Sequence, residues 1–385
     1  MGQYSRRRNA ERIYERARRE LSRETSRKAK SRVNWDDLSG HELLTLRHEV
    51  LQELVKEGVK KAGSRKKLER QTNITKRAIK EILEEGRDTI AVKTLERLLD
   101  FLNEPYDSVN KDIIAIGGSR NPDAIKNPRL PFDFNTPQGA TIIAAALKDG
   151  WIDTQHRFRY ANLDERNKKR VKEAVRAVFG DIASPFIEKE GRGTAIIEFR
   201  SYAIGEALEK AGVLVGRKAF HPYRVPEFIR EGSPEVKRAY LYQTLMDEGS
   251  WKPNYIGYSQ SVSIEKKLTD KDREYIKNCI DFEEIALIGT RQYIAPITKD
   301  LEQKIKEENP HLWKVIKDSK PPNMEDENKM LEDLCGVKGN IKPREIYYTE
   351  KYGYRVCWVA RIGGKENYDK VIKGIGLDKR GKHYD

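Results

Sequence analysis

Cysteine is scarce in this sequence and is spread without regular spacing. Only three of the 385 residues are cysteine, Cys279, Cys335 and Cys357, and no two of them form a Cys-x-x-Cys pair. This spacing favours neither a structural zinc site nor a disulfide framework, so we expect idle thiols in a reducing compartment. The sequence also lacks an apolar amino-terminal stretch and any run of about 18 apolar residues, which predicts a cytoplasmic protein without a membrane-spanning helix.

Acidic residues are too few to balance the basic ones. Lysine and arginine total 75 against 61 aspartate and glutamate residues, which gives a formal net charge of +14. A positive charge favours a polyanionic partner, because each neutralised phosphate releases counterions. We therefore expect a nucleic-acid-binding, nucleoid-associated protein of a prokaryote. The 35% of charged residues also fits a thermophilic source.

Residues 1–34 concentrate this charge. They hold 12 lysines and arginines and 4 glutamates, a net charge of +8 (12 − 4), and few apolar residues. We interpret the segment as a basic N-terminal arm that follows DNA phosphates, although a solvated tail has the same composition.

Residues 35–110 are expected to form an all-α domain. At its start Leu43, Leu46, Val50 and Leu54 recur at helical spacing, which predicts an amphipathic helix. Near its end a leucine-rich helix is expected, stopped by Pro105.

Two short helices separated by a tight turn are expected within this domain. Ser64 is placed to cap the first helix, and Thr75 the second. Their order, followed by a Gly-containing loop and a further helix, resembles the helix-turn-helix of the Cro/C1 type. The resemblance implies that the second helix enters the DNA major groove, and a small helical bundle with a solvated basic face is the alternative. The candidate DNA-binding residues of this helix are Thr75, Lys76, Arg77 and Lys80.

Glycine and proline interrupt residues 111–139, which predicts a linker. From residue 140 onward, helical segments alternate with period-two runs such as TAIIEFR (194–200) and YRVCWVARI (354–362). This alternation predicts an α+β region after the linker.

Two segments of the α+β region are similar to each other. IIAAALKDGW (142–151) and LYQTLMDEGSW (241–251) are apolar helices that end in an acid-Gly pair, with a tryptophan within two residues. Strand pairs and a closing helix follow each segment, so the order α-β-β-α-β-β-α is expected twice, in residues 140–232 and 233–385. Residues from about 265 to 340 are expected to form a charged, mainly helical insertion in the second repeat.

These segments resemble the two motifs of single-chain LAGLIDADG homing endonucleases. The approach to the second, VPEFIREGSPEVKRAYLYQTLMDEGSW (225–251), carries a Pro-x-x-Ile run and a Ser-Pro-Glu helix start that are similar to those of the family. The resemblance implies a monomer in which two tandem repeats form a pseudo-two-fold saddle. It also implies that the motif helices pack together and that a sheet from each half faces double-stranded DNA.

The resemblance implies which residues act. The acid at the end of each motif helix binds divalent cations, typically Mg²⁺, over the scissile phosphates, and Asp149 and Glu248 hold these positions. The small residue expected at the helix contact is Ala144 in the first motif but Gln243 in the second. A large, polar Gln243 requires a wider or hydrogen-bonded helix contact.

Alternate residues of a strand share one face, so we expect the polar set of each strand to face DNA. In the second repeat Gln260 belongs to the opposite, mostly apolar set. It is still counted as a DNA-reading candidate, because a shift of the strand by one residue would turn it towards DNA. Basic residues beside the expected strands are candidates for phosphate or catalytic support: Lys189, Lys218 and Arg355. The candidate DNA-reading residues are Gln155, Arg157, Arg159, Ser259, Gln260, Ser261 and Ser263.

The sequence leaves more than one function open. The first is a site-specific, metal-dependent double-strand DNA endonuclease assisted by the helix-turn-helix, which Asp149 and Glu248 favour. The second is a non-catalytic transcriptional regulator built on a LAGLIDADG domain, which Gln243 and the large helical domain favour. RNA binding is a third, less specific class.

Overall fold

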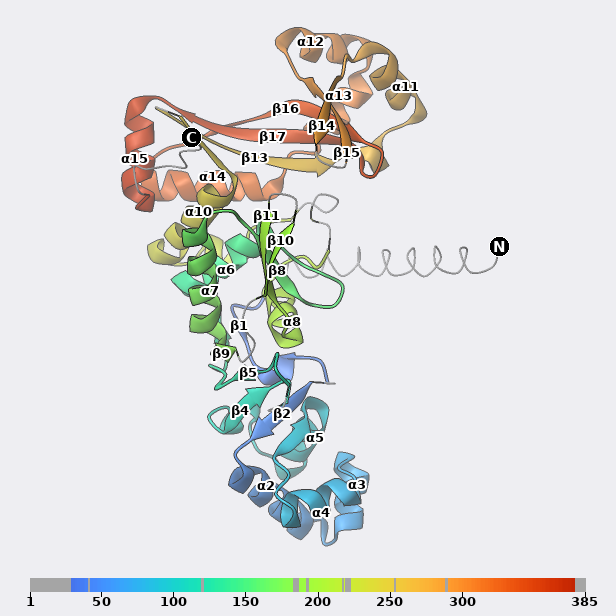
Figure 1. Cartoon of the computed structure of the whole chain (residues 1–385), viewed down its shortest axis with the longest axis vertical. Coiled ribbons are helices and arrows are strands. Elements are labelled where there is room, and N and C mark those ends of the chain that lie inside the picture. Colours follow the sequence, from blue (N-terminus) through green and yellow to red (C-terminus); the bar gives the residue numbers. More distant parts are fainter. Residues whose placement is uncertain are drawn as a thin grey trace, which may run out of the picture. The chain divides into compact units, whose positions relative to one another are not determined.

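The computed structural model describes residues 29–40, 42–118, 121–182, 187–191, 194–216, 218, 223–252, 254–287 and 290–377. Most of the basic arm expected at residues 1–34 lies outside the described residues. The chain divides into two compact units, residues 1–216 and 217–385, and each is described by itself (Figure 1). Within the described ranges, no helix has the length and apolar character needed to cross a membrane.

The first unit begins with a cluster of capped, amphipathic helices. The Ser64 hydroxyl accepts a hydrogen bond from the amide of Lys67 at 3.3 Å, and the Thr75 hydroxyl accepts one from Ala78 at 3.1 Å, as the sequence predicts. Asn73 ends the first capped helix in the left-handed conformation. The helices are α2 (His48–Ala62), α3 (Arg65–Thr72), α4 (Lys76–Glu84) and α5 (Val92–Leu102). Their shared core contains Leu51, Val55, Leu68, Ile79, Ile82, Leu95 and Leu98.

The expectation that this region is all-α is wrong. Strand β2 (Leu43–Leu46) replaces the first turns of the expected helix and pairs antiparallel with β3 (Thr89–Ala91) and β4 (Ile113–Ile116). A short apolar run fits a buried strand as well as a helix. The flanking strands decide the outcome here, because they pair with the backbone groups of β2 on both sides.

The expected linker supplies strands to the first unit. β4 and β5 (Ile125–Lys126) belong to a sheet of order β3-β2-β4-β5-β9, in which β9 is Asp181–Ile182. β6 (Phe132–Asp133) pairs with β1 (Arg32–Val33). Two short 3-10 helices, η1 (Trp35–Asp37) and η2 (Tyr106–Val109), lie beside these elements in the chain. Residues 111–139 therefore join the helical cluster and the following region through shared sheets.

The rest of the first unit is a four-stranded antiparallel sheet with helices against its apolar face. Its strands run in the order β10-β11-β8-β7. Phe158 and Phe199 stack on the buried face with ring centroids 5.2 Å apart, and Tyr160 lies beside them. In chain order the elements are α6 (Pro137–Leu147), β7 (Gly150–Ile152), β8 (Phe158–Ala161), α7 (Glu165–Phe179), β10 (Ile187–Gly191), β11 (Thr194–Phe199) and α8 (Tyr202–Lys210).

The second unit has the same order of elements. Its sheet runs β12-β13-β17-β16-β15-β14, so its first four strands follow the order of β7-β8-β11-β10. Helix α10 packs against α14 and β13, and α15 packs against β17, on one face of the sheet (Figure 1). These elements are α9 (Glu227–Arg230), α10 (Pro234–Glu248), β12 (Gly249–Lys252), β13 (Tyr255–Ser263), α14 (Pro322–Cys335), β16 (Asn340–Thr349), β17 (Gly353–Gly363) and α15 (Lys365–Ile375).

A segment between β13 and α14 enlarges the second unit. It contains η4 (Glu265–Lys267), α11 (Asp270–Cys279), β14 (Glu283–Leu287), β15 (Thr290–Pro296), α12 (Lys299–Glu308) and α13 (Pro310–Lys317). Strand β15 pairs with β16, so the segment widens the sheet by two strands. Helix α14 lies within the range expected for the insertion, 265–340. However, it occupies the place in the second unit that α7 occupies in the first.

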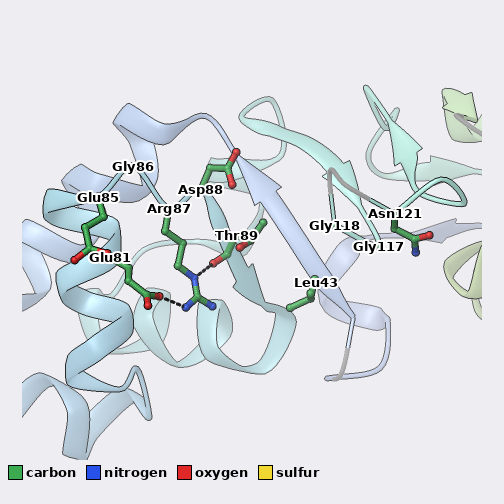
Figure 2. A pocket seen from close by; sticks show the side chains of 10 residues that line it. All are labelled: Leu43, Glu81, Glu85, Gly86, Arg87, Asp88, Thr89, Gly117, Gly118 and Asn121. Carbon is green, nitrogen blue, oxygen red and sulfur yellow. Dashed lines mark hydrogen bonds and ion pairs between the residues drawn. The ribbon is translucent and has the colours of Figure 1, made fainter.

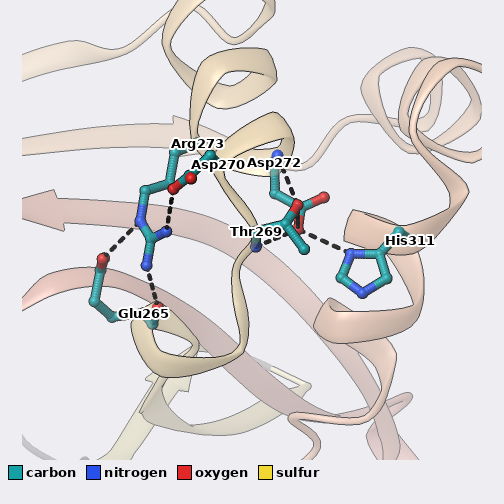
Figure 3. A network of polar contacts seen from close by, with 6 residues as sticks. All are labelled: Glu265, Thr269, Asp270, Asp272, Arg273 and His311. Atoms are coloured by element: carbon teal, nitrogen blue, oxygen red, sulfur yellow. Dashed lines mark hydrogen bonds and ion pairs between the residues drawn. The ribbon is translucent and has the colours of Figure 1, made fainter.

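Charged side chains within this segment form a network of polar contacts (Figure 3). Through Glu265 this network also contacts the hairpin of β16 and β17. Asp272 and Thr269 form a reciprocal cap at the start of α11, and the Asp272 carboxylate lies 2.8 Å from Nδ1 of His311 on α13. Arg273 donates from Nε to Glu265 at 3.1 Å, and the other oxygen of Glu265 accepts the amide hydrogen of Tyr354 at 2.9 Å.

We predict that Asp272→Ala loosens α11 and α13. The Asp272 side chain is 1% exposed. Burial alone raises its pKa, but the hydrogen bonds from Thr269 and His311 outweigh burial and lower it. The stabilisation is therefore present above about pH 4, the pKa of an unfolded aspartate, and is lost as the pH falls through the lower folded value. Loss of this cap costs about 1 kcal/mol, which faster amide hydrogen exchange in α11 and α13 would reveal.

The matched control is Asp270→Ala in the same helical turn. Asp270 is fully exposed and contacts only the outer side of Arg273 among the interactions described for it. Equal effects of the two substitutions on hydrogen exchange would contradict the role given to Asp272.

Candidate nucleic-acid interface and acidic site

Each unit places one acid where its first repeat helix passes into its first strand. Asp149 follows the end of α6 and directly precedes β7, and Glu248 is the last residue of α10 and directly precedes β12. Both side chains are partly exposed. The two acids therefore occupy the same position in the order of elements, as the sequence comparison predicts.

The glycine after each acid is required by space rather than by dihedral angle. A Cβ atom on Gly150 would lie 2.7 Å from the Ala145 carbonyl oxygen, and one on Gly249 would lie 2.0 Å from the Leu245 carbonyl oxygen. Both distances are too short for a carbon atom, so the strand leaves the helix along a path that only glycine permits. The acid-Gly pair is thus a structural unit that fixes where the acid stands.

The surroundings of the two acids differ. Asn162 donates from Nδ2 to Oδ2 of Asp149 at 3.1 Å and to the Tyr160 hydroxyl at 3.0 Å. In the second unit the neighbouring acid Asp247 is buried and accepts a hydrogen bond from Nε2 of Gln243 at 2.9 Å. Asp247 is thus buried, and Glu248 is the more exposed acid at this helix end.

Ion pairs connect the charged side chains on the polar face of the first sheet and at its edge. Arg159 donates from Nε to Glu198 at 2.7 Å across the strand pair, and Arg157 donates to Asp153 at 2.8 Å. Arg200 also donates to Glu198, at 3.0 Å. Arg159 lies on β8, whereas Arg157 directly precedes this strand, and each is already paired with a carboxylate.

Gln155 is not on this strand face, which corrects the expected register. It lies in the turn that precedes β8, where its amide donates to Asp153 at 2.8 Å, and its side chain is exposed. His156 follows with a positive φ of 54° and bonds Glu209 of α8. The turn bends the chain between β7 and β8, so β8 begins later than the period-two pattern predicts.

The sheet of the second unit presents hydroxyl groups on the face opposite its helices. Ser259, Ser261 and Ser263 alternate along β13 with the buried Tyr258 and Val262, but the hydroxyl oxygen of Ser263 is itself buried. Gln260 lies on the helix-covered face, where its side-chain oxygen accepts a hydrogen bond from Asn323 of α14 at 2.6 Å. Its placement corrects the expectation that Gln260 could read DNA.

Basic side chains that the sequence analysis did not single out lie on the same face as these serines. Strand pairing aligns Ser259 with Val359 and Val359 with Lys342, and it aligns Gly257 with Arg361. Lys342 and Arg361 are exposed and border a cavity of about 260 Å³ together with Arg344. We call Lys342, Arg344 and Arg361 the basic end of the sheet. The alternation of Arg355 and Arg361 with buried residues in YRVCWVARI is the sequence signal that could have found it.

Arg355 lies further along this face between two tyrosines. Its guanidinium carbon is 5.5 Å from the ring centre of Tyr352 and 6.0 Å from that of Tyr347. Burial lowers the pKa of Arg355. Lys218, another candidate for support, is partly exposed, and the side chain of Lys189 lies outside the described residues.

Helix α4 presents the candidate residues of the helix-turn-helix. Thr75 caps the helix, and Lys76, Arg77 and Lys80 are exposed along its first turns. Arg77 donates from Nε to Glu81 at 2.6 Å, and Lys80 pairs with Glu85 at 2.9 Å. Hydrogen bonds to these glutamates raise the pKa of both basic groups.

A cavity of about 780 Å³ lies between the C-terminal end of α4 and strand β2 (Figure 2). Figure 2 shows Arg87 reaching from its wall to the Glu81 carboxylate. The cavity is lined by Leu43, Glu81, Glu85, Gly86, Arg87, Asp88, Thr89, Gly117, Gly118 and Asn121.

Comparisons with known proteins give only distant likenesses. No protein-family model matches the chain, and no curated protein matches it. One similar solved structure is described as a mesophilic variant of the homing endonuclease I-DmoI, at 11% identity and a TM-score of 0.34, over 64% of this chain and 100% of that chain. Another is the N-terminal LAGLIDADG domain of DUF199/WhiA, at 8% identity and a TM-score of 0.30, over 66% of this chain and 88% of that domain. Similarity this low does not establish a family or an activity for the chain.

The acid-Gly junctions lead to a stability prediction. We expect Gly150→Ala and Gly249→Ala each to lower the free energy of unfolding by roughly 1–3 kcal/mol, because the added methyl group meets backbone atoms that cannot move independently. Gly363→Ala is the control, since a Cβ atom there meets no atom within 4 Å. If the melting temperature measured by calorimetry falls equally in all three variants, the backbone does not approach Gly150 and Gly249 as closely as described.

The basic end of the sheet leads to a binding prediction. Lys342→Ala and Arg361→Ala should weaken DNA binding at every sequence, and each should reduce the salt slope of the binding constant by about 1. Lys365→Ala, an exposed position on α15, removes the same charge away from this face. Titrations at several salt concentrations in which all three variants have the same slope would argue against a DNA-facing sheet.

Proposed function

We propose that the chain is a site-specific double-strand DNA endonuclease of the LAGLIDADG type. Two α-β-β-α-β-β-α repeats form a pseudo-two-fold saddle in a monomer, and the helix-turn-helix adds a second grip on DNA. The observation that carries this proposal is the equivalent placement of Asp149 and Glu248, each between the first helix and the first strand of its repeat. A single helix-end acid is unremarkable, but an acid at a helix C-terminus is disfavoured by the helix dipole, so two equivalent ones favour a role in chemistry.

Double-stranded DNA is the partner that the charges favour. The net charge of +14, the exposed cations of α4 and the basic end of the second sheet all present positive groups to a polyanion. The polar faces of the two sheets also carry hydroxyl and guanidinium groups that hydrogen-bond to base edges and phosphates.

Divalent cations, typically Mg²⁺, fit the chemistry of the acids. Carboxylate oxygens are hard ligands, and both side chains are partly exposed, so water and phosphate oxygens can complete the coordination. Within the described parts of the chain, no group of three or more His, Cys, Asp or Glu side chains gathers as a metal site. A cation that binds together with DNA would take its remaining ligands from phosphate oxygens and water rather than from a cluster of protein side chains.

The chain's own groups have separate tasks in this proposal. Asp149 and Glu248 would hold the cations, which would supply charge neutralisation at the scissile phosphates and activation of water. Asn162 keeps the Asp149 carboxylate in one orientation through its 3.1 Å hydrogen bond. Arg355, Lys189 and Lys218 support the phosphate backbone or the chemistry. The serines of β13 and the first turns of α4 read or grip the flanking sequence.

One observation favours the second candidate, a non-catalytic transcriptional regulator. Gln243 is fully buried in α10 and bonds the buried Asp247 of the same helix turn. A nuclease of this type needs a small residue at this position of its motif helix, so the large, polar and buried Gln243 favours binding without cleavage.

Cleavage tests the proposal directly. The full-length chain is incubated with Mg²⁺ and a plasmid library that carries its own genomic flanking sequence. We expect linear products, and we expect Asp149→Asn or Glu248→Gln to reduce cleavage by roughly 100-fold or more without weakening DNA binding, because each acid would hold a cation that neutralises charge at the phosphates.

The control is Glu235→Gln, which removes an exposed acid from the first turn of the same helix as Glu248 and should leave cleavage unchanged. Sequence-specific binding without any metal-dependent cut in the wild type would contradict the nuclease and leave the regulator.

A further inference from the structure

Arg77 is the basic residue of α4 whose side chain is held most firmly, because Glu81 binds its guanidinium group. Arg77 is 88% exposed and belongs to the first turn of α4. Its Nε atom donates to Oε1 of Glu81 at 2.6 Å, one helical turn later. Among the described residues, its two terminal nitrogens make no hydrogen bond.

Glu81 is itself fixed from the other side. Its Oε2 atom accepts a hydrogen bond from Nη1 of Arg87 at 2.8 Å, and Arg87 also donates from Nε to the backbone oxygen of Thr89 in β3 at 3.0 Å (Figure 2). Glu81 is only 20% exposed, although the arginine it holds extends into solvent. The two arginines therefore bracket one carboxylate, and the chain of contacts anchors Arg77 to strand β3.

This arrangement differs from that of the neighbouring pair. Lys80 and Glu85 are both more than half exposed, and neither has a further anchor of this kind. A lysine is also a single-point donor, whereas arginine presents a planar fork. Lys80 thus suits a phosphate, which accepts a flexible point charge.

We infer that Glu81 orients Arg77 so that its two terminal nitrogens read one guanine in the major groove. The bond to Glu81 occupies Nε and leaves the end-on pair of N–H donors, whose spacing matches O6 and N7 of guanine. Holding a long side chain in one direction before binding removes part of the entropy lost on contact. Arg77 is the specificity-determining residue, and Glu81 is a positioning residue that acts through it. The inference rests on the proposed DNA-binding role of α4 and adds the base class that it reads.

The test is selection of bound duplexes from a random library by the full-length chain, with and without substitutions. The wild type should enrich a guanine at one position, and Arg77→Ala should lower that preference roughly 10- to 100-fold. Arg77→Lys should lose most of the preference while keeping affinity for random duplex, because it keeps the charge and loses the fork. Glu81→Gln should lower the preference roughly threefold or more, without weakening binding to random duplex.

Glu85→Gln is the matched control. It removes the same charge just after the end of the same helix, but Glu85 holds Lys80, so the guanine preference should remain. Thermal unfolding of each variant separates this effect from a general loss of structure, which would lower all binding rather than the preference at one base.

Two results would overturn the inference in different ways. If the wild type enriches a motif and Glu81→Gln keeps the guanine preference that Arg77→Ala loses, Glu81 does not position Arg77, although the proposed DNA-binding role stands. If the wild type binds no duplex above background, the proposed function fails and the inference fails with it.

Discussion

The close approach of backbone to backbone at the acid-Gly junctions is the constraint on which the proposed site depends. In each repeat the first strand starts so near to the last turn of the first helix that a Cβ atom would collide with a carbonyl oxygen, of Ala145 in one and Leu245 in the other. The glycine therefore fixes the direction of the strand, and the acid before it is held at the helix end. The same junction occurs twice, so one carboxylate lies at the matching place in each unit.

The sheets that leave these junctions separate an apolar face from a polar one. Tyr258 and Val262 pack towards the helices of the second unit, whereas Ser259 and Ser261 between them face away. In the first unit Arg159 on the polar face is neutralised by Glu198, which is nearly inaccessible to water. The first polar face is thus internally paired, and the second carries Lys342 and Arg361 in the open. The two sheets share an order of strands but present different surfaces.

Much of this fold can be predicted from the sequence, because its signals are local. The caps at Ser64 and Thr75, the acid-Gly pairs and the alternation in YRVCWVARI each depend on a few neighbouring residues. Strand β2 could not be predicted in the same way. Its four residues form a strand only because β3 and β4, which lie 40 or more residues later in the chain, pair with it on both sides.

Some features of the candidate site also follow from neighbouring residues, and others depend on contacts with distant parts of the chain. The positions of Asp149 and Glu248 follow from the repeat in the sequence. The register of Gln155 and the face of Gln260 do not, because a turn shifts the start of β8 and because Asn323, distant in the chain, captures Gln260. The hydrogen bonds of Arg77 and Arg87 to Glu81 also depend on the conformation of the loop after α4. The sequence pattern does not predict this conformation.

The proposed function depends on Asp149 and Glu248 holding divalent cations at DNA phosphates. The most direct measurement replaces Mg²⁺ by Fe²⁺ in the complex of the full-length chain with duplex DNA, generates hydroxyl radicals at the bound iron, and maps the cuts in the polypeptide by mass spectrometry. We predict cuts close to Asp149 and close to Glu248, and we predict that Asp149→Asn and Glu248→Gln each diminish the cuts at the substituted position. Cuts at neither acid, or cuts that persist at an acid after its substitution, would contradict the proposal.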